Sequence, residues 1–159
     1  MNATIIYLDS TAIVKRYIKE RGSDGVREFY VKAYNGEHRL SFSLWNIGEV
    51  LWAFDRARRV NRLDEDEYYL VRGRFLIETR RLSRLGILDL IPLKIADLIP
   101  LKIAILIESW RLIEKYHIYE ADAIQIASAK HIKAENLLAS DKRLYEIALS
   151  EGLNSIYLE

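Results

Sequence analysis

Short apolar runs alternate with longer amphipathic segments along the whole sequence, and this alternation limits the folds open to the chain. Aliphatic and β-branched runs predict strands at residues 4–8, 39–43, 87–91, 137–139 and 155–158. Strands that alternate with helices indicate a mainly parallel sheet of four to five short strands with helices on both faces. Because no Gly/Ser-rich linker divides the 159 residues, we expect a single α/β domain over residues 1–159.

Helix start and stop signals fill the segments between these strands. Ser23 is a suitable N-cap, Asp64 and Glu67 have the spacing of a capping box, and Gly86 ends the long segment that follows them. These signals predict helices at about residues 10–20, 23–34, 44–60, 64–86, 101–116, 120–133 and 142–150.

An octapeptide at residues 89–96 is repeated without change at residues 97–104. A single tandem copy is a local duplication, because repeat architectures need several units. Either copy could supply the strand that begins near Ile87, and the other copy then belongs to the connection. Pro92 and Pro100 exclude one uninterrupted helix across the pair.

The composition excludes several classes of protein. The absence of cysteine rules out disulfides, thiolate chemistry and sulfur-ligated metals. With 24 basic and 23 acidic residues the net charge is +1, which excludes a uniformly basic nucleic-acid coat but allows a local patch. The N-terminus lacks the basic region of a signal peptide, and the longest apolar stretch, residues 87–107, contains four charged side chains. We therefore expect a cytoplasmic protein with no membrane segment.

Four acidic residues lie in apolar surroundings. Asp9 and Asp141 each follow a predicted buried strand, and Glu49 and Asp122 lie on largely apolar predicted helices. The carboxyl ends of strands are where open α/β sheets bind ligands. If the four acids converge, their mutual repulsion requires a cation, and an all-oxygen site suits Mg²⁺ or Mn²⁺.

Each of these acids also has an ordinary structural interpretation. Asp9 and Asp141 could be helix N-caps, because a helix is predicted after both. Asp122 could cap its helix or face solvent, and Glu49 could pair with Arg56 or another arginine. Other α/β chemistries lack their motifs, since the chain has neither a phosphate-binding GxxxxGK[ST] loop nor a GxGxxG after the first strand. The three histidines lie far apart in the sequence and indicate no metal site.

The ordered set of short motifs resembles the PIN-domain ribonucleases, and most closely the VapC-type toxins of prokaryotic toxin–antitoxin pairs. The resemblance rests on Tyr-Leu-Asp-Ser-Thr-Ala-Ile-Val-Lys at 7–15, Gly-Ser at 22–23, Ser43, Glu-Val at 49–50, Ala-Asp-Ala-Ile with Ala127 at 121–127, and Ser-Asp-Lys-Arg-Leu at 140–144. It implies a PIN-like fold and a metal-dependent endoribonuclease. Asp9, Glu49, Asp122 and Asp141 would be the catalytic residues and the ligands of Mg²⁺ or Mn²⁺, with Ser10 and Ser140 in support.

Two features depart from the family pattern. The family commonly has a hydroxyl side chain two residues before its last acid, where this chain has Ala139, and the octapeptide duplication is not part of the pattern. The resemblance further implies a homodimer and an antitoxin whose segment lies in a helix-lined groove. The alternative is a non-catalytic PIN-like module that binds protein or RNA.

Arginine is concentrated in one part of the chain. Nine of the fifteen arginines lie between residues 56 and 84, with a local excess of four positive charges. Because arginine suits phosphate forks, Arg56, Arg72 and Arg74 are candidate RNA-binding residues. The alternatives are ion pairs on solvated helix faces or contacts with an acidic partner. We expect Trp45 and Trp52 to form the core or a pocket wall rather than to stack on bases.

Overall fold

The structure is a computed structural model of the chain that describes residues 4–91 and 100–158. Its five strands form one sheet in the order β3-β2-β1-β4-β5, and every neighbouring pair is parallel. The parallel α/β fold expected from the sequence is therefore confirmed. The strands are β1 (Ile5–Leu8), β2 (Arg39–Ser43), β3 (Leu88–Ile91), β4 (Asn136–Ala139) and β5 (Ser155–Tyr157).

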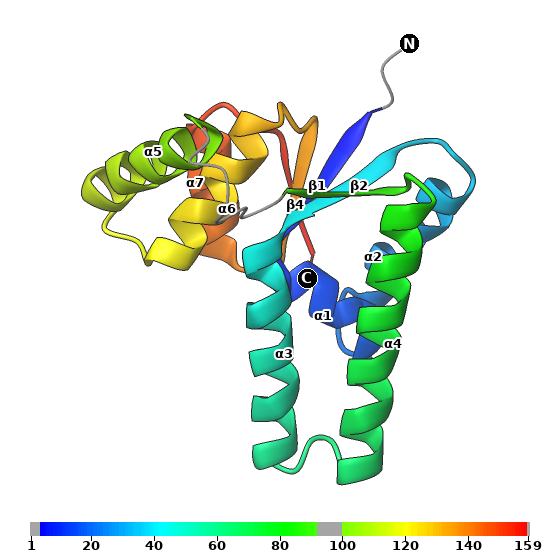
Figure 1. Ribbon diagram of the computed structural model, residues 1–159. Helices are drawn as coiled ribbons and strands as arrows, with labels where there is room; N and C mark the ends of the chain where they lie inside the picture. The colour runs from blue at the N-terminus through cyan, green and yellow to red at the C-terminus, as the bar shows by residue number, and fades with distance from the viewer. Residues whose placement is uncertain (1–3, 92–99, 159) are drawn as a thin grey trace.

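Seven helices lie within the described residues, and they cover both faces of the sheet (Figure 1). Side chains alternate along each strand, so Leu8 packs among α1 to α4 while Tyr7 packs with α5 to α7. Both faces are thus buried, as a parallel sheet requires. The helices are α1 (Ser10–Tyr17), α2 (Ser23–Tyr34), α3 (Leu44–Arg59), α4 (Glu65–Arg84), α5 (Pro100–Tyr116), α6 (Glu120–His131) and α7 (Lys142–Ser150).

Helix α1 is shorter than the sequence predicts, because it ends at Tyr17 and not near Glu20. Ile18 takes an extended backbone conformation, and its carbonyl accepts a hydrogen bond from the Ser23 hydroxyl. The same hydroxyl accepts from the backbone N–H of Glu20 at 2.9 Å. These side-chain bonds stabilise a turn that competes with helix continuation.

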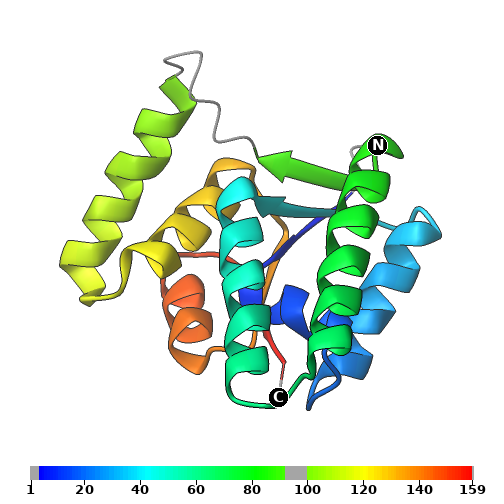
Figure 2. The same ribbon diagram turned by 60° about the horizontal axis from the view of Figure 1, so that its bottom comes forward.

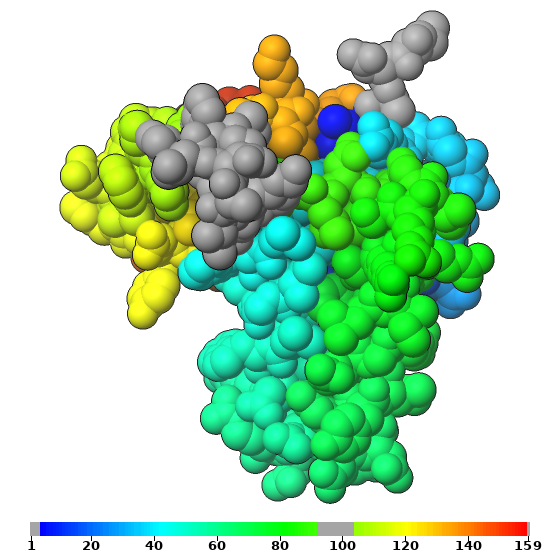
Figure 3. Space-filling view, in the orientation of Figure 1, coloured from blue at the N-terminus to red at the C-terminus, as the bar shows by residue number. Residues whose placement is uncertain are grey.

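Helices α3 and α4 run side by side in opposite directions and extend from the sheet as an arm (Figures 1–3). The predicted capping box is present at the start of α4. The Asp64 side chain accepts a hydrogen bond from the Glu67 N–H at 2.7 Å, and the Glu67 side chain accepts one from the Asp64 N–H at 2.9 Å. Phe54 of α3 and Phe75 of α4 pack edge-to-face between the two helices and α1. These aromatic contacts therefore pack the α3–α4 arm against α1.

On the opposite face, a nearly buried carboxylate joins the three helices that follow the duplication. The Glu151 side chain, at the end of α7, accepts hydrogen bonds from Lys115 and Lys130 at 2.9 and 2.8 Å. It also accepts from the Tyr116 hydroxyl at 2.8 Å and from Arg111. Because these donors come from α5 and α6, a single carboxylate links the end of α7 to both of these helices.

The structure describes a different part of each octapeptide copy. Residues 89–91 of the first copy complete β3, whereas residues 100–104 of the second copy form the start of α5. The strand is thus supplied by the first copy, and the second copy contributes to a helix as well as to the connection. Residues 92–99, which make up the rest of the pair, lie outside the described residues. Among the described helices, none combines the length and apolarity needed to cross a membrane.

We predict that deletion of residues 97–104 leaves a cooperatively folded protein. Residues 92–96 have the same sequence as residues 100–104 and can replace them. The deletion removes as many residues as lie between β3 and α5, so the first turn of α5 must unwind to connect the helix to Ile91. Because helix ends fray readily, this change at one end of a 17-residue helix leaves the strands and the rest of α5 in place. Thermal unfolding followed by circular dichroism should show one sharp transition, and a broad or absent transition would mean that both copies are structurally required.

Candidate active site

The candidate site lies where the central strand meets its neighbour β4. The register pairs Leu8 with Leu138, and the Asp9 N–H donates to the Leu138 carbonyl at 3.1 Å. The chain order reverses at this point of the sheet, which is the usual place for a ligand crevice. Asp9 and Asp141 therefore leave adjacent strands at the same edge. Both are also N-caps, since Asp9 accepts from the Ala12 N–H and Asp141 from the Leu144 N–H.

The Asp9 carboxylate is almost fully buried, with 1 % of the residue exposed. Burial raises its pKa to about 7, and the negative charge of Glu49 adds to the shift. The Thr11 hydroxyl donates to both carboxylate oxygens, at 2.9 and 2.7 Å, and accepts from the Ser140 N–H at 3.1 Å. Thr11 thus connects the first acid to the segment that carries the last one.

Glu49 projects from α3 and is held by two amide side chains. The Asn46 and Gln125 amide nitrogens both donate to its Oε2, each at 3.3 Å. Burial raises the pKa of Glu49, the charge of Asp122 raises it further, and the Ser10 and Trp45 side chains counter the shift in part. An ion pair with Arg56 was one alternative for Glu49, but Arg56 lies over the Trp52 ring, at 5.5 Å from the ring centroid.

Asp122 lies in the first turn of α6 and is partly buried. Burial raises its pKa, and the charge of Asp141 raises it further. The charge of Glu49 thus raises the pKa of Asp9, that of Asp122 raises the pKa of Glu49, and that of Asp141 raises the pKa of Asp122. Each of these pairs lies within electrostatic range, although the acids come from two strand ends and two helices.

The donor chemistry of this neighbourhood fits a hard divalent cation. Neighbouring carboxylates that disfavour one another's ionised state gain from a positive charge between them, and oxygen ligands are those that Mg²⁺ and Mn²⁺ prefer. Among the described residues, no group of three or more Asp, Glu, His or Cys side chains is arranged as a metal site. The case for a divalent cation therefore rests on the carboxylate oxygens as ligands and on the repulsion between the carboxylates.

A buried polar network surrounds Glu49, and the sequence reasoning missed it. Gln125 is 2 % exposed, and its Oε1 accepts from the Ser10 N–H at 3.2 Å while its amide reaches Glu49. The Asn46 Oδ1 accepts from the Ser43 hydroxyl and N–H at 2.9 Å and from the Tyr7 hydroxyl at 3.1 Å. The sequence signal that could have predicted this network was an amide residue among apolar residues, Asn46 in α3 and Gln125 in α6.

The two supporting serines have different places in the structure. Ser10 is the first residue of α1 and lines the groove next to Glu49. Ser140 contributes its N–H to Thr11, while its hydroxyl oxygen is buried without a hydrogen-bond partner among the described residues. The hydroxyl that contacts Asp9 is therefore that of Thr11, which the sequence analysis did not select.

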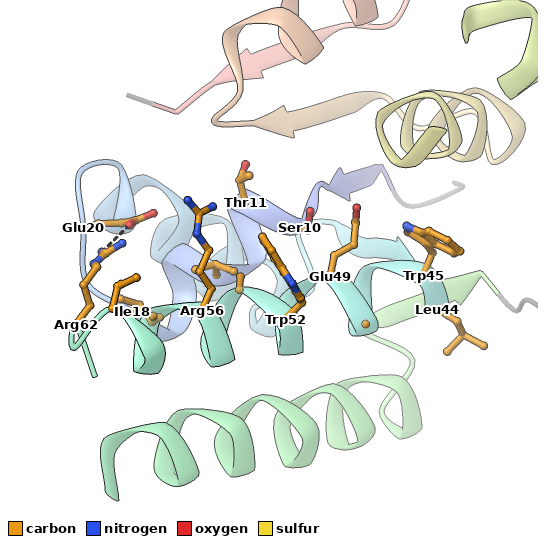
Figure 4. A pocket seen from close by; sticks show the side chains of 15 residues that line it. Ser10, Thr11, Ile18, Glu20, Leu44, Trp45, Glu49, Trp52, Arg56 and Arg62 are labelled. Atoms are coloured by element: carbon orange, nitrogen blue, oxygen red, sulfur yellow. Dashed lines mark hydrogen bonds and ion pairs between the residues drawn. The ribbon is translucent and has the colours of Figure 1, made fainter. Parts of the chain in front are cut away.

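A groove of about 990 Å³ runs between α1 and α3 from Ser10, Thr11 and Glu49 to the ion pair of Glu20 with Arg62 (Figure 4). Trp45 and Trp52 line it and are 42 % and 57 % exposed. They form a pocket wall, as predicted. The wall of the groove is thus mostly apolar, with Glu49 at one end and the Glu20–Arg62 ion pair at the other.

The candidate RNA-binding arginines do not form one surface. Arg56 lines the groove, Arg74 lines a separate hollow beside α1 and α2, and Arg72 is exposed on α4 without lining either. Other arginines of the cluster form ion pairs, as the alternative interpretation expected. Arg58 and Arg59 both pair with Asp55 at 2.9 Å.

Comparison with protein families and solved structures identifies the fold. The family model described as the PIN domain matches residues 6–149. The VapBC2 complex of Rickettsia felis, solved with a DNA fragment from its promoter, contains a chain with a TM-score of 0.61 and 13 % identity, and the match covers 98 % of this chain and 100 % of that one.

Two further solved structures have similar scores. FitAcB from Neisseria gonorrhoeae matches with a TM-score of 0.61 and 16 % identity over 95 % of this chain and 96 % of that one. VapC20 of Mycobacterium tuberculosis, described as a toxin that cleaves the sarcin-ricin loop, matches with a TM-score of 0.60 and 11 % identity over 96 % and 98 %. No curated protein matches the chain.

We predict that Asp9→Asn stabilises the protein at high pH when EDTA removes divalent ions. The pKa of Asp9 rises from 3.8 to about 7 on folding, so between these values the folded state holds a proton that the unfolded state has lost. The native protein therefore loses stability as pH rises from about 4 to 7, by at most about 4 kcal/mol, and the loss persists above pH 7. Asn cannot titrate and caps a helix about as well as Asp.

Urea unfolding at pH 4 to 8 measures this effect as the difference between the native protein and Asp9→Asn. Asp64→Asn is the matched control, because it makes the same change at the exposed N-cap of α4. The control should keep the native pH dependence. Parallel pH profiles for the native protein and Asp9→Asn would show that Asp9 does not titrate between these pH values.

We predict that Gln125→Ala lowers the free energy of unfolding by about 1–3 kcal/mol, because it leaves the Ser10 N–H without its partner and opens space in the core. His131→Ala, at the exposed end of the same helix, should change it by less than about 0.5 kcal/mol. Urea denaturation compares the two. Equal small effects would mean that water replaces the amide at no cost.

Proposed function

The chain belongs to the PIN domain family, and from this premise we propose that it is a metal-dependent endoribonuclease that acts as the toxin of a toxin–antitoxin pair. The observation that carries the proposal is the run of four acids in which Glu49, Asp122 and Asp141 each raise the pKa of a neighbour. Repulsion between these carboxylates lowers the stability of the protein when no metal is bound. A bound cation would offset this cost, and acids with raised pKa values beside a groove are typical of functional sites.

In this proposal Asp9, Glu49, Asp122 and Asp141 are the catalytic residues and hold Mg²⁺ or Mn²⁺ together with water. A bound ion of this kind supplies an activated water for attack on the phosphodiester and stabilises the charge on the leaving oxygen. Thr11 keeps the buried carboxylate of Asp9 in place through its two short hydrogen bonds. Asn46 and Gln125 orient the Glu49 carboxylate from two different helices.

The groove supports an antitoxin as the partner in this proposal. Its wall exposes Trp52 and Val60, each 57 % accessible, and aromatic surface of this kind is typical of protein interfaces. A segment lying along it would reach Glu49 and thereby control access to the acids. A homodimer is also part of the proposal, supported by Ile107 and Trp110, which are 54 % and 53 % exposed on α5. We place the protein in the cytoplasm.

We predict that the native protein cleaves single-stranded RNA with Mg²⁺ or Mn²⁺ and not with EDTA. Asp9→Asn and Asp122→Asn should each lose more activity than the 10–100-fold that is typical when an outer-shell partner of a metal is lost. Asp66→Asn, an exposed acid in the first turn of α4, is the matched control and should keep native activity.

The same variants test metal binding without cleavage. Excess Mn²⁺ should raise the melting temperature of the native protein and of Asp66→Asn, but have little effect on Asp9→Asn. If all three proteins shift equally and none cleaves RNA, the nuclease assignment is wrong. The non-catalytic binding module is then the remaining interpretation.

A further inference from the structure

A second hollow, of about 440 Å³, lies beside helices α1, α2 and α4. It uses a different set of α1 residues from the groove, namely Lys15, Arg16 and Tyr17, together with Lys19 just after the helix. Of the eight residues that line it, five are cationic and one is acidic. The whole protein has a net charge of only +1, so positive charge is concentrated here.

Two of the five cations are already neutralised. Lys15 is buried and donates to the Arg21 carbonyl, with the Glu20 carboxylate at 3.8 Å. Arg16 pairs with Glu78 at 2.9 Å. These two side chains are committed to the fold and cannot turn freely towards a ligand.

The other three cations carry uncompensated charge. Lys19, Arg27 and Arg74 are exposed and line the hollow from the α1–α2 connection, α2 and α4, and none forms an ion pair within the described part of the chain. Asp24 is the single acid in the lining. Three like charges around one concavity repel one another and focus a positive potential, which an anion relieves.

We propose that this hollow binds the phosphate backbone of single-stranded RNA outside the cleavage site. This inference rests on the proposed nuclease function and extends its substrate contact to a second surface. Helix α1 joins the two places, because its first residue lies beside the acids and its far end carries Lys15 and Arg16. Its eight residues span about 12 Å. A strand of a few nucleotides can therefore reach both.

An acidic protein segment is the less suitable occupant. Protein interfaces need a desolvated apolar centre, whereas charged residues are depleted there. The hollow has no exposed aliphatic lining, and its one aromatic residue, Tyr17, uses its hydroxyl to donate to Glu78 at 2.8 Å. Arginine forks and mobile lysine heads are instead the groups that contact phosphate oxygens in nucleic-acid complexes.

The salt dependence of RNA binding tests the proposal. Fluorescence anisotropy with a labelled single-stranded RNA in EDTA measures affinity at several salt concentrations while cleavage is prevented. The triple variant Lys19→Ala/Arg27→Ala/Arg74→Ala should lower the log–log salt slope by about 0.7 for each phosphate that is no longer neutralised, or about 2 in total. The control Arg80→Ala/Arg84→Ala/Lys133→Ala removes the same charge from exposed positions away from the hollow and should keep nearly the native slope.

The outcomes separate this inference from the nuclease proposal. A flatter slope for the hollow variant alone supports the RNA site even if the native protein fails to cleave RNA. Equal slopes for the two triple variants overturn it, and do so even if the native protein is an active nuclease. A flatter slope in both would mean a diffuse charge effect and would also overturn the assignment to the hollow.

Discussion

The parallel pairing of β1 with β2 on one side and with β4 on the other determines where the acids of this molecule can meet. Parallel neighbours end at the same edge of the sheet, so residues far apart in sequence come together there without any special contact between them. Asp9 and Asp141 are separated by more than a hundred residues, yet one backbone hydrogen bond at the end of β1 sets their strands in register. The helices after these strands then start at the same edge, and each acid caps one.

Burial of these carboxylates lowers the stability of the fold, and in the proposed function the same carboxylates are the catalytic groups. A capping carboxylate is ordinarily exposed, but Asp9 is buried and shares its surroundings with other acids. The protein compensates with hydrogen bonds from neutral groups: a threonine hydroxyl for Asp9, and two buried amides for Glu49. Neutral donors hold the carboxylates in position without an opposite charge of their own. In the proposed function, a cation would supply that opposite charge.

Local patterns in the sequence predicted nearly all of the fold, because strand, cap and turn signals act over a few residues. The capping box at Asp64 and the parallel sheet are confirmed. Asp9 caps α1, as one interpretation predicted, and its membership of an acidic group stays a prediction that the cap does not exclude. Thr11 and Gln125 were not predicted, because their importance depends on partners 129 and 115 residues away. The basic hollow was also missed, since it combines charges from three helices that no single segment reveals.

The octapeptide contributes to two core elements through its two copies. Its first three residues complete β3 in the first copy, and its last five residues begin α5 in the second copy. A tandem duplication preserves the original residues at both of its junctions, so β3 and α5 each retain their native flanking sequence. A duplication of this kind lengthens a protein without adding new sequence at the boundary of a core element. Loss of residues 97–104 would remove no residue of any strand, so all five strands would keep their own sequence.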